Sequence, residues 1–375
     1  MLSYLKILYQ KTRGIIYIIL YDFHKITKKV DSKRILFLSD SRNEVSGNFL
    51  FIYNELKNED YNVKFFLKAN LDSVKKISDK YYLTYLIATS KYIFLDDYYP
   101  IIYPLKLRKG TEVIQLWHAM GAFKKVGYSR TSSTINSLTH RGYSSAIVSS
   151  EQIRKNYAEA FNMDLDKVLA LGVPRTDIFF DDKYMEKIIK QKHQIYPQIK
   201  NKKVILFAPT FRGKGQKEGY YDFSWIDFVR FKNELKETYI CLIKLHPFIK
   251  NKPDYSFEED DFYIDLSSER EINDFLFITD VLITDYSSVI FEYSFLKKPV
   301  VFFVPDLEEY KNERDFYYPI KKYIYGEIAC NSEDLITKIK KPELKHEKLE
   351  EFQNFFCSAC DGKSTKRIVN YFIRK

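Results

Sequence analysis

Residues 280–303 read DVLITDYSSVIFEYSFLKKPVVFF, and this stretch decides the fold. It contains two short apolar runs, at 281–283 and 300–303, and a helix is expected to begin between them near Ser287 or Ser288. Continuous apolar runs that flank helical segments are typical of parallel strands covered on both faces. The stretch therefore predicts one strand–helix–strand unit of a parallel sheet.

Similar apolar runs recur along the chain and form two sets. The first set lies at 34–39, 63–67, 92–95, 113–117, 146–149 and 168–171, and the second at 203–207, 239–243, 262–265, 281–283 and 300–303. Two sets of strand–helix units predict an α/β protein with two Rossmann-like, doubly wound parallel-sheet domains. We expect these domains over 31–190 and 191–350, after a basic N-terminal segment at 1–30 and before a terminal helical region at 351–375.

The size and charge of the chain restrict its partners. Its 375 residues suggest about two domains, at roughly 100–200 residues each. The 60 Lys and Arg residues against 50 Asp and Glu give a formal net charge of +10, which favours phosphates or an anionic membrane surface. The basic excess does not gather into an aromatic–basic nucleic-acid module, and the four cysteines lack the spacing of a zinc site. We therefore expect no nucleic-acid partner and no dedicated metal or cofactor.

The N-terminal segment combines an apolar run at 15–21 with basic residues on both sides. The basic residues are Lys6, Lys11 and Arg13 before the run and Lys25, Lys28 and Lys29 after it. The run is far shorter than the roughly 20 residues that span a bilayer. Two interpretations stay open: a helix that lies in a membrane interface, or an ordinary first helix packed on the domain.

Histidines follow two of the predicted strands, and ligands of open α/β sheets bind beyond the carboxyl ends of strands. His118 comes after the run at 113–117 and is followed by small residues, which let a ligand approach the backbone. A histidine there can accept a proton near neutral pH, and the alternative is a core histidine bonded to backbone. Lys244 and His246 follow the run at 239–243, where two cationic or titratable groups suit a diphosphate.

Two further clusters end predicted strands. Arg175, in GVPRTD at 172–177, can clamp a phosphate or pair with Asp177 to hold a turn. Thr210 and Arg212 can hydrogen-bond and neutralise a phosphate, or belong to a capping loop. The residues alone leave these alternatives open.

The last cluster follows the run at 281–283. Ser287 and Ser288 offer hydroxyls and a helix N-terminus to an anion, although N-capping by serine is the preferred explanation when this cluster is taken alone. Glu292 comes about one helical turn later and can accept hydrogen bonds from ribose hydroxyls. The cluster is therefore a candidate nucleotide site.

Taken in chain order, these clusters resemble the CDP-glycerol glycerophosphotransferase family of teichoic acid synthesis. The matching stretches are QLWHAMGAFKKVGY (115–128), GVPRTD (172–177), ILFAPTFR (205–212), IKLHP (243–247), DVLITDYSSVIFEYSFLKKPVVFF (280–303), DLEEY (306–310) and DGKST (361–365). Each motif alone is weak, whereas the ordered set is highly specific. The chain looks most like the short glycerol-phosphate primase subgroup.

The resemblance implies a GT-B-like fold, in which two Rossmann-like domains face a cleft. The C-terminal domain would bind CDP-glycerol, and the N-terminal domain would face an undecaprenyl-diphosphate-linked saccharide acceptor. The protein would be peripheral, at the cytoplasmic face of the cell membrane. The implied reaction transfers glycerol phosphate to an acceptor hydroxyl and releases CMP, with His118 as the base and His246 stabilising the leaving CMP.

The resemblance also implies a set of residues that contact the donor. They are His118, Ala119, Met120, Gly121, Ala122, Arg175, Pro209, Thr210, Arg212, Lys244, Leu245, His246, Ser287, Ser288 and Glu292. The chain departs from the family at one point, because Ala-Met-Gly follows His118 where many members have Gly-Thr-Pro.

Three alternatives accompany this interpretation. The first is a CDP-ribitol ribitolphosphotransferase or a polymerase of the same family, and the second is a GT-B glycosyltransferase that uses a nucleotide sugar. The donor, CDP-glycerol or CDP-ribitol against a nucleotide sugar, distinguishes the second alternative. The third is a non-enzymatic protein that binds membranes or polyanions, for which binding would depend on salt and not on His118.

Overall fold

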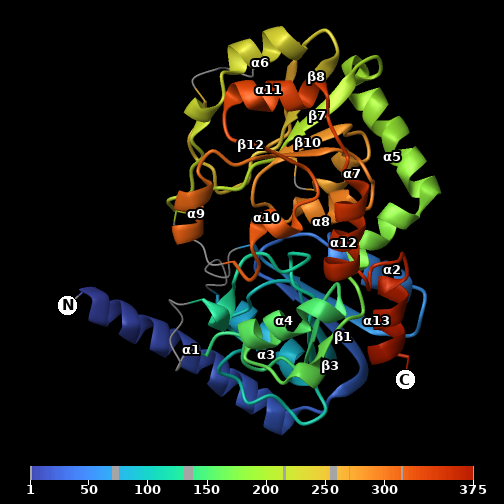
Figure 1. Cartoon of the computed structure of the whole chain (residues 1–375). Coiled ribbons are helices and arrows are strands. Elements are labelled where there is room, and N and C mark those ends of the chain that lie inside the picture. Colours follow the sequence, from blue (N-terminus) through green and yellow to red (C-terminus); the bar gives the residue numbers. More distant parts are fainter. Residues whose placement is uncertain are drawn as a thin grey trace. The chain divides into compact units, whose positions relative to one another are not determined.

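The computed structural model describes residues 2–69, 76–130, 138–213, 217–253, 260–269, 271–313 and 316–374, without the side chains of 2–13, 311–313 and 320. The chain forms two compact units (Figure 1). Unit 1 comprises Met1–Asp177 and Ser358–Lys375, and unit 2 comprises Ile178–Cys357. The first segment of unit 1 therefore ends at Asp177, before the expected domain limit at residue 190.

Unit 1 contains a six-stranded parallel sheet. Its helices and strands are α1 Leu2–Thr27, β1 Asp31–Ser39, α2 Asn48–Leu56, β2 Asn62–Leu67, α3 Ile77–Thr89, β3 Ser90–Leu95, β4 Glu112–Gln115, β5 Ser145–Ile147, α4 Arg154–Phe161, β6 Val168–Leu169 and α13 Ser364–Phe372. The strands lie in the order β2-β1-β3-β4-β5-β6, and all neighbours pair in parallel. The order changes direction between β1 and β3, which is where such sheets bind ligands.

The core of unit 1 forms between this sheet and helices α2 and α13. Ile35 and Phe37 of β1 are 0% exposed and share one cluster with Phe49 of α2 and Ile368 of α13. The rings of Phe37 and Phe49 lie 5.1 Å apart, edge to face. A strand that is buried on both faces has an unbroken apolar sequence, which is why the run at 34–39 was visible beforehand.

A side chain that is distant in sequence anchors the terminal helix α13 in unit 1. The Asp177 carboxylate accepts hydrogen bonds from the backbone N–H groups of Ser364 and Thr365, both at 2.9 Å. N–H groups in the first turn of a helix have no partner inside the helix. Asp361 also pairs with Arg367, at 2.7 and 2.8 Å. The DGKST stretch therefore docks the terminal helix.

Unit 2 contains the second six-stranded parallel sheet. Its helices and strands are α5 Asp182–Ile195, β7 Lys203–Phe207, α6 Phe228–Leu235, β8 Tyr239–Ile243, β9 Tyr263–Asp265, α7 Asn273–Leu276, β10 Val281–Thr284, α8 Val289–Ser294, β11 Val300–Phe303, α9 Leu307–Glu313, α10 Ile320–Tyr323, β12 Glu327–Ala329, α11 Ser332–Lys340 and α12 His346–Phe356. The order β12-β11-β10-β7-β8-β9 is that of a Rossmann sheet, with its change of direction between β7 and β10.

Helices α6 and α11 lie side by side over one face of the unit 2 sheet (Figure 1). Phe231 of α6 and Leu335 of α11 share a core cluster with Ile205 of β7 and Ile283 of β10. Every apolar run predicted above contains a strand, so the predicted α/β, GT-B-like architecture with two parallel sheets is confirmed. Strand β12 was missed because its sequence, Glu-Ile-Ala, has no continuous apolar pattern.

Replacing Asp177 by Ala should lower the free energy of unfolding of unit 1 by about 2 kcal/mol, because two amides of α13 lose a charged acceptor. Chemical denaturation followed by the fluorescence of Trp117, in a Trp225→Phe background, measures this change. Asp166→Ala is the control, since Asp166 is exposed in the same unit. Equal losses in the two variants would contradict the anchoring role of Asp177.

Candidate functional site

His118 follows β4 and lies beside an aspartate that the sequence analysis did not select. The Nδ1 atom of His118 is 3.1 Å from Oδ1 of Asp97, which follows β3. The side chains of His118 and Asp97 are 44% and 22% exposed. Both residues lie beyond the carboxyl ends of neighbouring strands, close to the change in strand order. In the sequence, Asp97 could have been identified from the acidic pair at 96–97, which directly follows a predicted strand.

Further charged groups surround Asp97. Burial by itself would raise the pKa of Asp97. The contact of its carboxylate with His118 and the hydrogen bond from a backbone N–H outweigh burial, so the pKa of Asp97 lies below its usual value. Burial raises the pKa of Asp40 to about 7, and the negative charges of Asp97 and Asp96 add to this rise. Asp96 forms a buried ion pair with Arg42. The loops after β1 and β3 therefore bring three carboxylates and one guanidinium close together.

The loop that carries His118 is held in an unusual backbone conformation. Trp117 is 2% exposed and has a φ of 57°, which non-glycine residues rarely adopt. Its carbonyl accepts a hydrogen bond from Asn48 Nδ2 (2.9 Å), and Asn48 Oδ1 accepts one from the Arg175 N–H (3.1 Å). Arg175 donates from Nη1 to the His118 carbonyl (2.7 Å). Asn48, at the start of α2, thus connects the loops after β4 and β6 and brings Arg175 to His118.

The predicted donor stretch from Ala119 to Ala122 points mostly into the protein. Met120 and Ala122 are 2% and 6% exposed, and Gly121 is buried with a φ of 70°. The hydroxyl of Tyr157 on α4 donates to the Gly121 carbonyl at 2.7 Å. Ala119 is half-buried. Any contact of Met120 or Ala122 with a donor would therefore involve the backbone more than the side chain.

His118 is the accessible histidine of unit 1. His24 is 0% exposed and donates one hydrogen bond from Nε2 to the Tyr81 carbonyl, at 3.1 Å. His140 is 1% exposed, and its ring centroid lies 5.9 Å from that of Trp117. Burial lowers the pKa of His140 to about 4, so this ring stays neutral at physiological pH. Neither residue can exchange a proton directly with a bound substrate.

In unit 2, Arg212 holds together the loops that follow three strands. Its guanidinium donates to Asp306 from Nε (2.6 Å) and Nη2 (2.9 Å), and from Nη1 to Asp285 (2.8 Å) and to the Thr210 carbonyl (2.7 Å). Arg212 is 3% exposed and lies 4.7 Å from the centroid of the Tyr310 ring. Burial disfavours its charge, but the two carboxylates outweigh burial and raise the pKa of Arg212. Its charge therefore neutralises acidic side chains of the protein.

His246 follows β8 and has its tautomer set by the backbone. The N–H of Phe248 donates to His246 Nδ1 at 3.1 Å, so the proton of the neutral ring resides on Nε2. The rings of Phe211 and His246 lie 4.7 Å apart, which places the loops after β7 and β8 side by side. Lys244 is 8% exposed, and burial lowers the pKa of its amine. An N–H donor and a partly buried amine are groups that suit phosphate oxygens.

The other predicted residues of unit 2 lie at the carboxyl ends of the same strands. Thr210 is 5% exposed, and its N–H donates to Asp285 at 2.8 Å. Ser287 and Ser288 are half-buried just before α8, and Ser288 makes no capping hydrogen bond with its side chain. Glu292 on α8 is 2% exposed. Pro209 is buried and Leu245 is half-buried.

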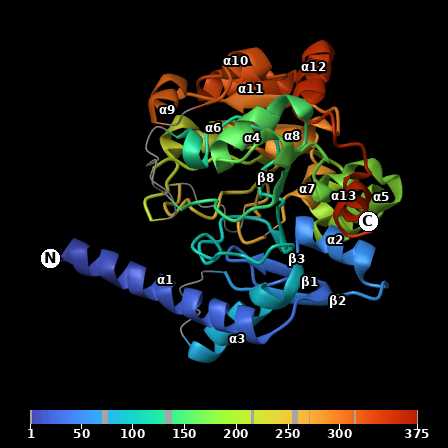
Figure 2. The ribbon, with the colours of Figure 1, turned by 90° about the horizontal axis from the view of Figure 1, so that it is seen from below.

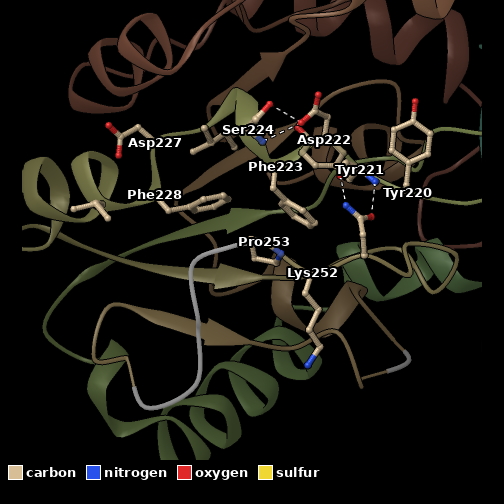
Figure 3. Close-up of a pocket in the computed structure, with 12 residues that line it drawn as sticks. Tyr220, Tyr221, Asp222, Phe223, Ser224, Asp227, Phe228, Lys252 and Pro253 are labelled. Atoms are coloured by element: carbon tan, nitrogen blue, oxygen red, sulfur yellow. Dashed lines mark hydrogen bonds between the residues drawn. The ribbon is translucent and has the colours of Figure 1, made fainter.

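A separate hollow of unit 2, about 590 Å³ in volume, contains none of the predicted site residues (Figure 3). Its lining residues are Tyr220, Tyr221, Asp222, Phe223, Ser224, Ile226, Asp227, Phe228, Val229, Asn251, Lys252 and Pro253. Asp222 accepts from the Ser224 N–H at 3.0 Å, and Asp227 caps α6 through the Arg230 N–H at 2.9 Å. Both carboxylates are thus engaged in local structure. Within the described ranges, no group of three or more His, Cys, Asp and Glu side chains is arranged to hold a metal ion.

Comparison of the sequence with known protein families shows to which family the chain belongs. The family described as CDP-glycerol:poly(glycerophosphate) glycerophosphotransferase matches residues 19–374. The chain belongs to this glycerophosphotransferase family. The resemblance inferred from the ordered motifs is therefore confirmed.

The relatives of this chain in the glycerophosphotransferase family are named either as ribitol-phosphate enzymes or as glycerol-phosphate enzymes. A teichoic acid poly(ribitol-phosphate) polymerase of Bacillus spizizenii is 48% identical over 92% of this chain and 56% of its own length. A teichoic acid ribitol-phosphate primase of the same species is 37% identical, with 91% of each chain covered. A teichoic acid glycerol-phosphate primase of Bacillus subtilis is 33% identical over 76% of this chain and 74% of its own. The chain thus spans just over half the length of the polymerase.

A solved structure agrees with the fold. The wall teichoic acid polymerase TagF superimposes with a TM-score of 0.78 and covers 100% of this chain and 98% of its own, at 22% identity. This likeness supports the GT-B-like arrangement of strands and helices in the glycerophosphotransferase family.

Replacing Arg212 by Met should lower the free energy of unfolding of unit 2 by about 3–5 kcal/mol, because Asp285 and Asp306 would be buried without a counter-ion. The fluorescence of Trp225 in a Trp117→Phe background reports denaturation of this unit. The matched control is Arg230→Met, since Arg230 is 47% exposed and pairs only on the surface, where about 1 kcal/mol or less is expected. Similar losses in both variants would mean that Arg212 is not required for folding.

Proposed function

We propose that this chain transfers ribitol phosphate from CDP-ribitol to a hydroxyl of an undecaprenyl-diphosphate-linked saccharide and releases CMP. The observation that carries the proposal is the pattern of identity among relatives. The ribitol-phosphate polymerase and primase are 48% and 37% identical, against 33% for the glycerol-phosphate primase. CDP-glycerol, the donor that the motifs implied, is therefore less well supported than the ribitol alternative.

The candidate site residues offer the groups that such a reaction needs. Transfer of a substituted phosphate depends on a base and on neutralisation of anionic oxygens more than on covalent help. In our proposal His118 Nε2 takes the proton of the attacking hydroxyl, whose oxygen bonds to the phosphorus that carries ribitol. The bond from this phosphorus to the oxygen of CMP then breaks. Lys244 and the Nε2–H of His246 stabilise the charge on the phosphate oxygens.

The donor is tested by CMP release from CDP-ribitol and from CDP-glycerol, with and without a lipid-linked disaccharide acceptor. We expect kcat/KM to be about tenfold or more higher for CDP-ribitol, because a site that hydrogen-bonds extra hydroxyls discriminates against a donor that lacks them. The mass of the product tells whether one unit or many are added. Preference for CDP-glycerol would overturn the ribitol proposal and restore the donor implied by the motifs.

Replacing His118 by Gln should reduce kcat by about 10²–10⁴-fold, since a general base contributes about this much. The same CMP assay measures the loss. His193→Gln is the control, because His193 lies on α5, away from the carboxyl ends of the strands. Near-normal turnover of His118→Gln with the correct acceptor would show that another group is the base.

We also propose that the protein is peripheral at the cytoplasmic face of the cell membrane and binds it through α1. Figures 1 and 2 show α1 beside α3, with its N-terminal half extending past α3. Tyr17 and Tyr21 face the unit and are 4% and 1% exposed, whereas Ile19 and Phe23 on the other side are 62% and 49% exposed. No helix in the described part of the chain is long and apolar enough to cross a membrane. Lys6, Lys11 and Arg13 belong to the part of α1 whose side chains are outside the description.

The double variant Ile19→Glu/Phe23→Glu should weaken binding to vesicles that contain phosphatidylglycerol by about tenfold or more per side chain, because burying such a side chain contributes about 1.5–3 kcal/mol. Vesicle sedimentation measures the bound fraction. Ile195→Glu is the control, since Ile195 is 63% exposed on another helix, α5. Unchanged binding of the double variant would exclude α1 as the contact.

A further inference from the structure

Asp97 contacts Nδ1 of His118 and leaves the other ring nitrogen, Nε2, to act as the base. The imidazole must present an unprotonated nitrogen to the acceptor hydroxyl, and its other nitrogen must then carry the proton. The contact of 3.1 Å joins His118 Nδ1 to Asp97 Oδ1. A carboxylate only accepts hydrogen bonds, so this contact favours the tautomer with the proton on Nδ1. Nε2 then keeps its lone pair on a side chain that is 44% exposed.

We propose that Asp97 is a positioning residue that fixes the proton-accepting tautomer of His118 and stabilises its protonated form during transfer. The proposal rests on the phosphotransfer proposed above. The proton of the acceptor hydroxyl moves to Nε2 while the new oxygen–phosphorus bond forms and the bond to CMP breaks. The ring then carries protons on both nitrogens and one positive charge. Asp97 stays ionised and balances this charge, as carboxylates do for catalytic histidines elsewhere.

The backbone around Asp97 holds the carboxylate in place. The N–H of Tyr98 donates to Asp97 Oδ1 at 2.7 Å, so the oxygen that meets His118 is already oriented. The side chain of Gln115 connects the two loops, because its Nε2 donates to the Asp97 carbonyl (3.0 Å) and its Oε1 accepts from the Trp117 N–H (2.9 Å). Gln115 is 0% exposed and is the last residue of β4. The hydrogen bonds of the buried Gln115 side chain thus fix the distance between the loops that carry Asp97 and His118.

The charges around Asp97 define how pH should affect the site. The groups that face it are Asp40 and Arg42 after β1, Asp96 and Tyr98 after β3, His118 after β4, and His140 before β5. Removing the Asp97 charge makes protonation of His118 less favourable. The acidic limb of the kcat/KM profile should therefore move to lower pH in Asp97→Asn. Removing the Asp97 charge also lowers the pKa of Asp40, so the shift is compared in an Asp40→Asn background, which removes this second titration.

Two substitutions separate the two tasks of Asp97. Asp97→Asn keeps an oxygen that the Tyr98 N–H still orients, so it should retain the tautomer, shift the acidic limb and lose about tenfold in kcat. Asp97→Ala removes the acceptor, so it should lose about 10²–10⁴-fold in kcat, with little change in the KM for CDP-ribitol. Asp60→Asn, in which the changed side chain is 93% exposed, is the control and should behave as the wild type. Thermal unfolding checks that each variant is folded.

Nitrogen NMR of the histidine-labelled protein tests the tautomer without any donor or acceptor. The His118 signals are assigned by their loss in His118→Gln. We expect a protonated Nδ1 and an unprotonated Nε2 in the wild type and in Asp97→Asn, and a shift toward protonated Nε2 in Asp97→Ala. An unchanged tautomer in Asp97→Ala, or an acidic limb that does not move, would overturn the proposal. If the wild type released no CMP from either donor, the function would fail while the NMR result still decided the role of Asp97 in the tautomer.

Discussion

Parallel pairing of the strands is the constraint on which the rest of this structure depends. Two parallel sheets place all carboxyl ends of each sheet along one edge, so residues far apart in sequence meet there. In unit 1 this edge brings Asp97 to His118, and in unit 2 it brings Arg212 to Asp285 and Asp306. The buried strands supply the framework, and the short loops after them supply the chemistry.

Buried charge has two different uses in these loops. Arg212 is surrounded by acceptors, and its hydrogen bonds to Asp285, Asp306 and a carbonyl compensate the cost of burial. This network gives the loops after β7, β10 and β11 a common anchor. Among the carboxylates after β1 and β3, Asp96 pairs with Arg42, and burial raises the pKa of Asp40 to about 7. Such incompletely balanced charge is typical of sites where proton transfer is arranged.

The two histidines at strand ends are held in complementary forms. A carboxylate contacts Nδ1 of His118, which favours a lone pair on Nε2. A backbone N–H donates to Nδ1 of His246, which leaves a proton on Nε2. One ring is therefore suited to accept a proton and the other to donate a hydrogen bond to an anionic oxygen. This difference supports the division of roles that we propose between them.

The sequence by itself determined the strands, the fold class and the family, because buried parallel strands have unbroken apolar runs and the ordered motifs are specific. It also pointed to His118 and His246, since both come soon after such runs. Only the tertiary structure selected Asp97, Asn48 and Gln115, whose partners lie in loops that follow other strands. It also decided that Arg175 supports the His118 backbone and that Arg212 balances two aspartates. The physical reason is that a charge or a hydrogen bond is satisfied by whatever lies next to it in space, and parallel strands bring together residues that the sequence keeps apart.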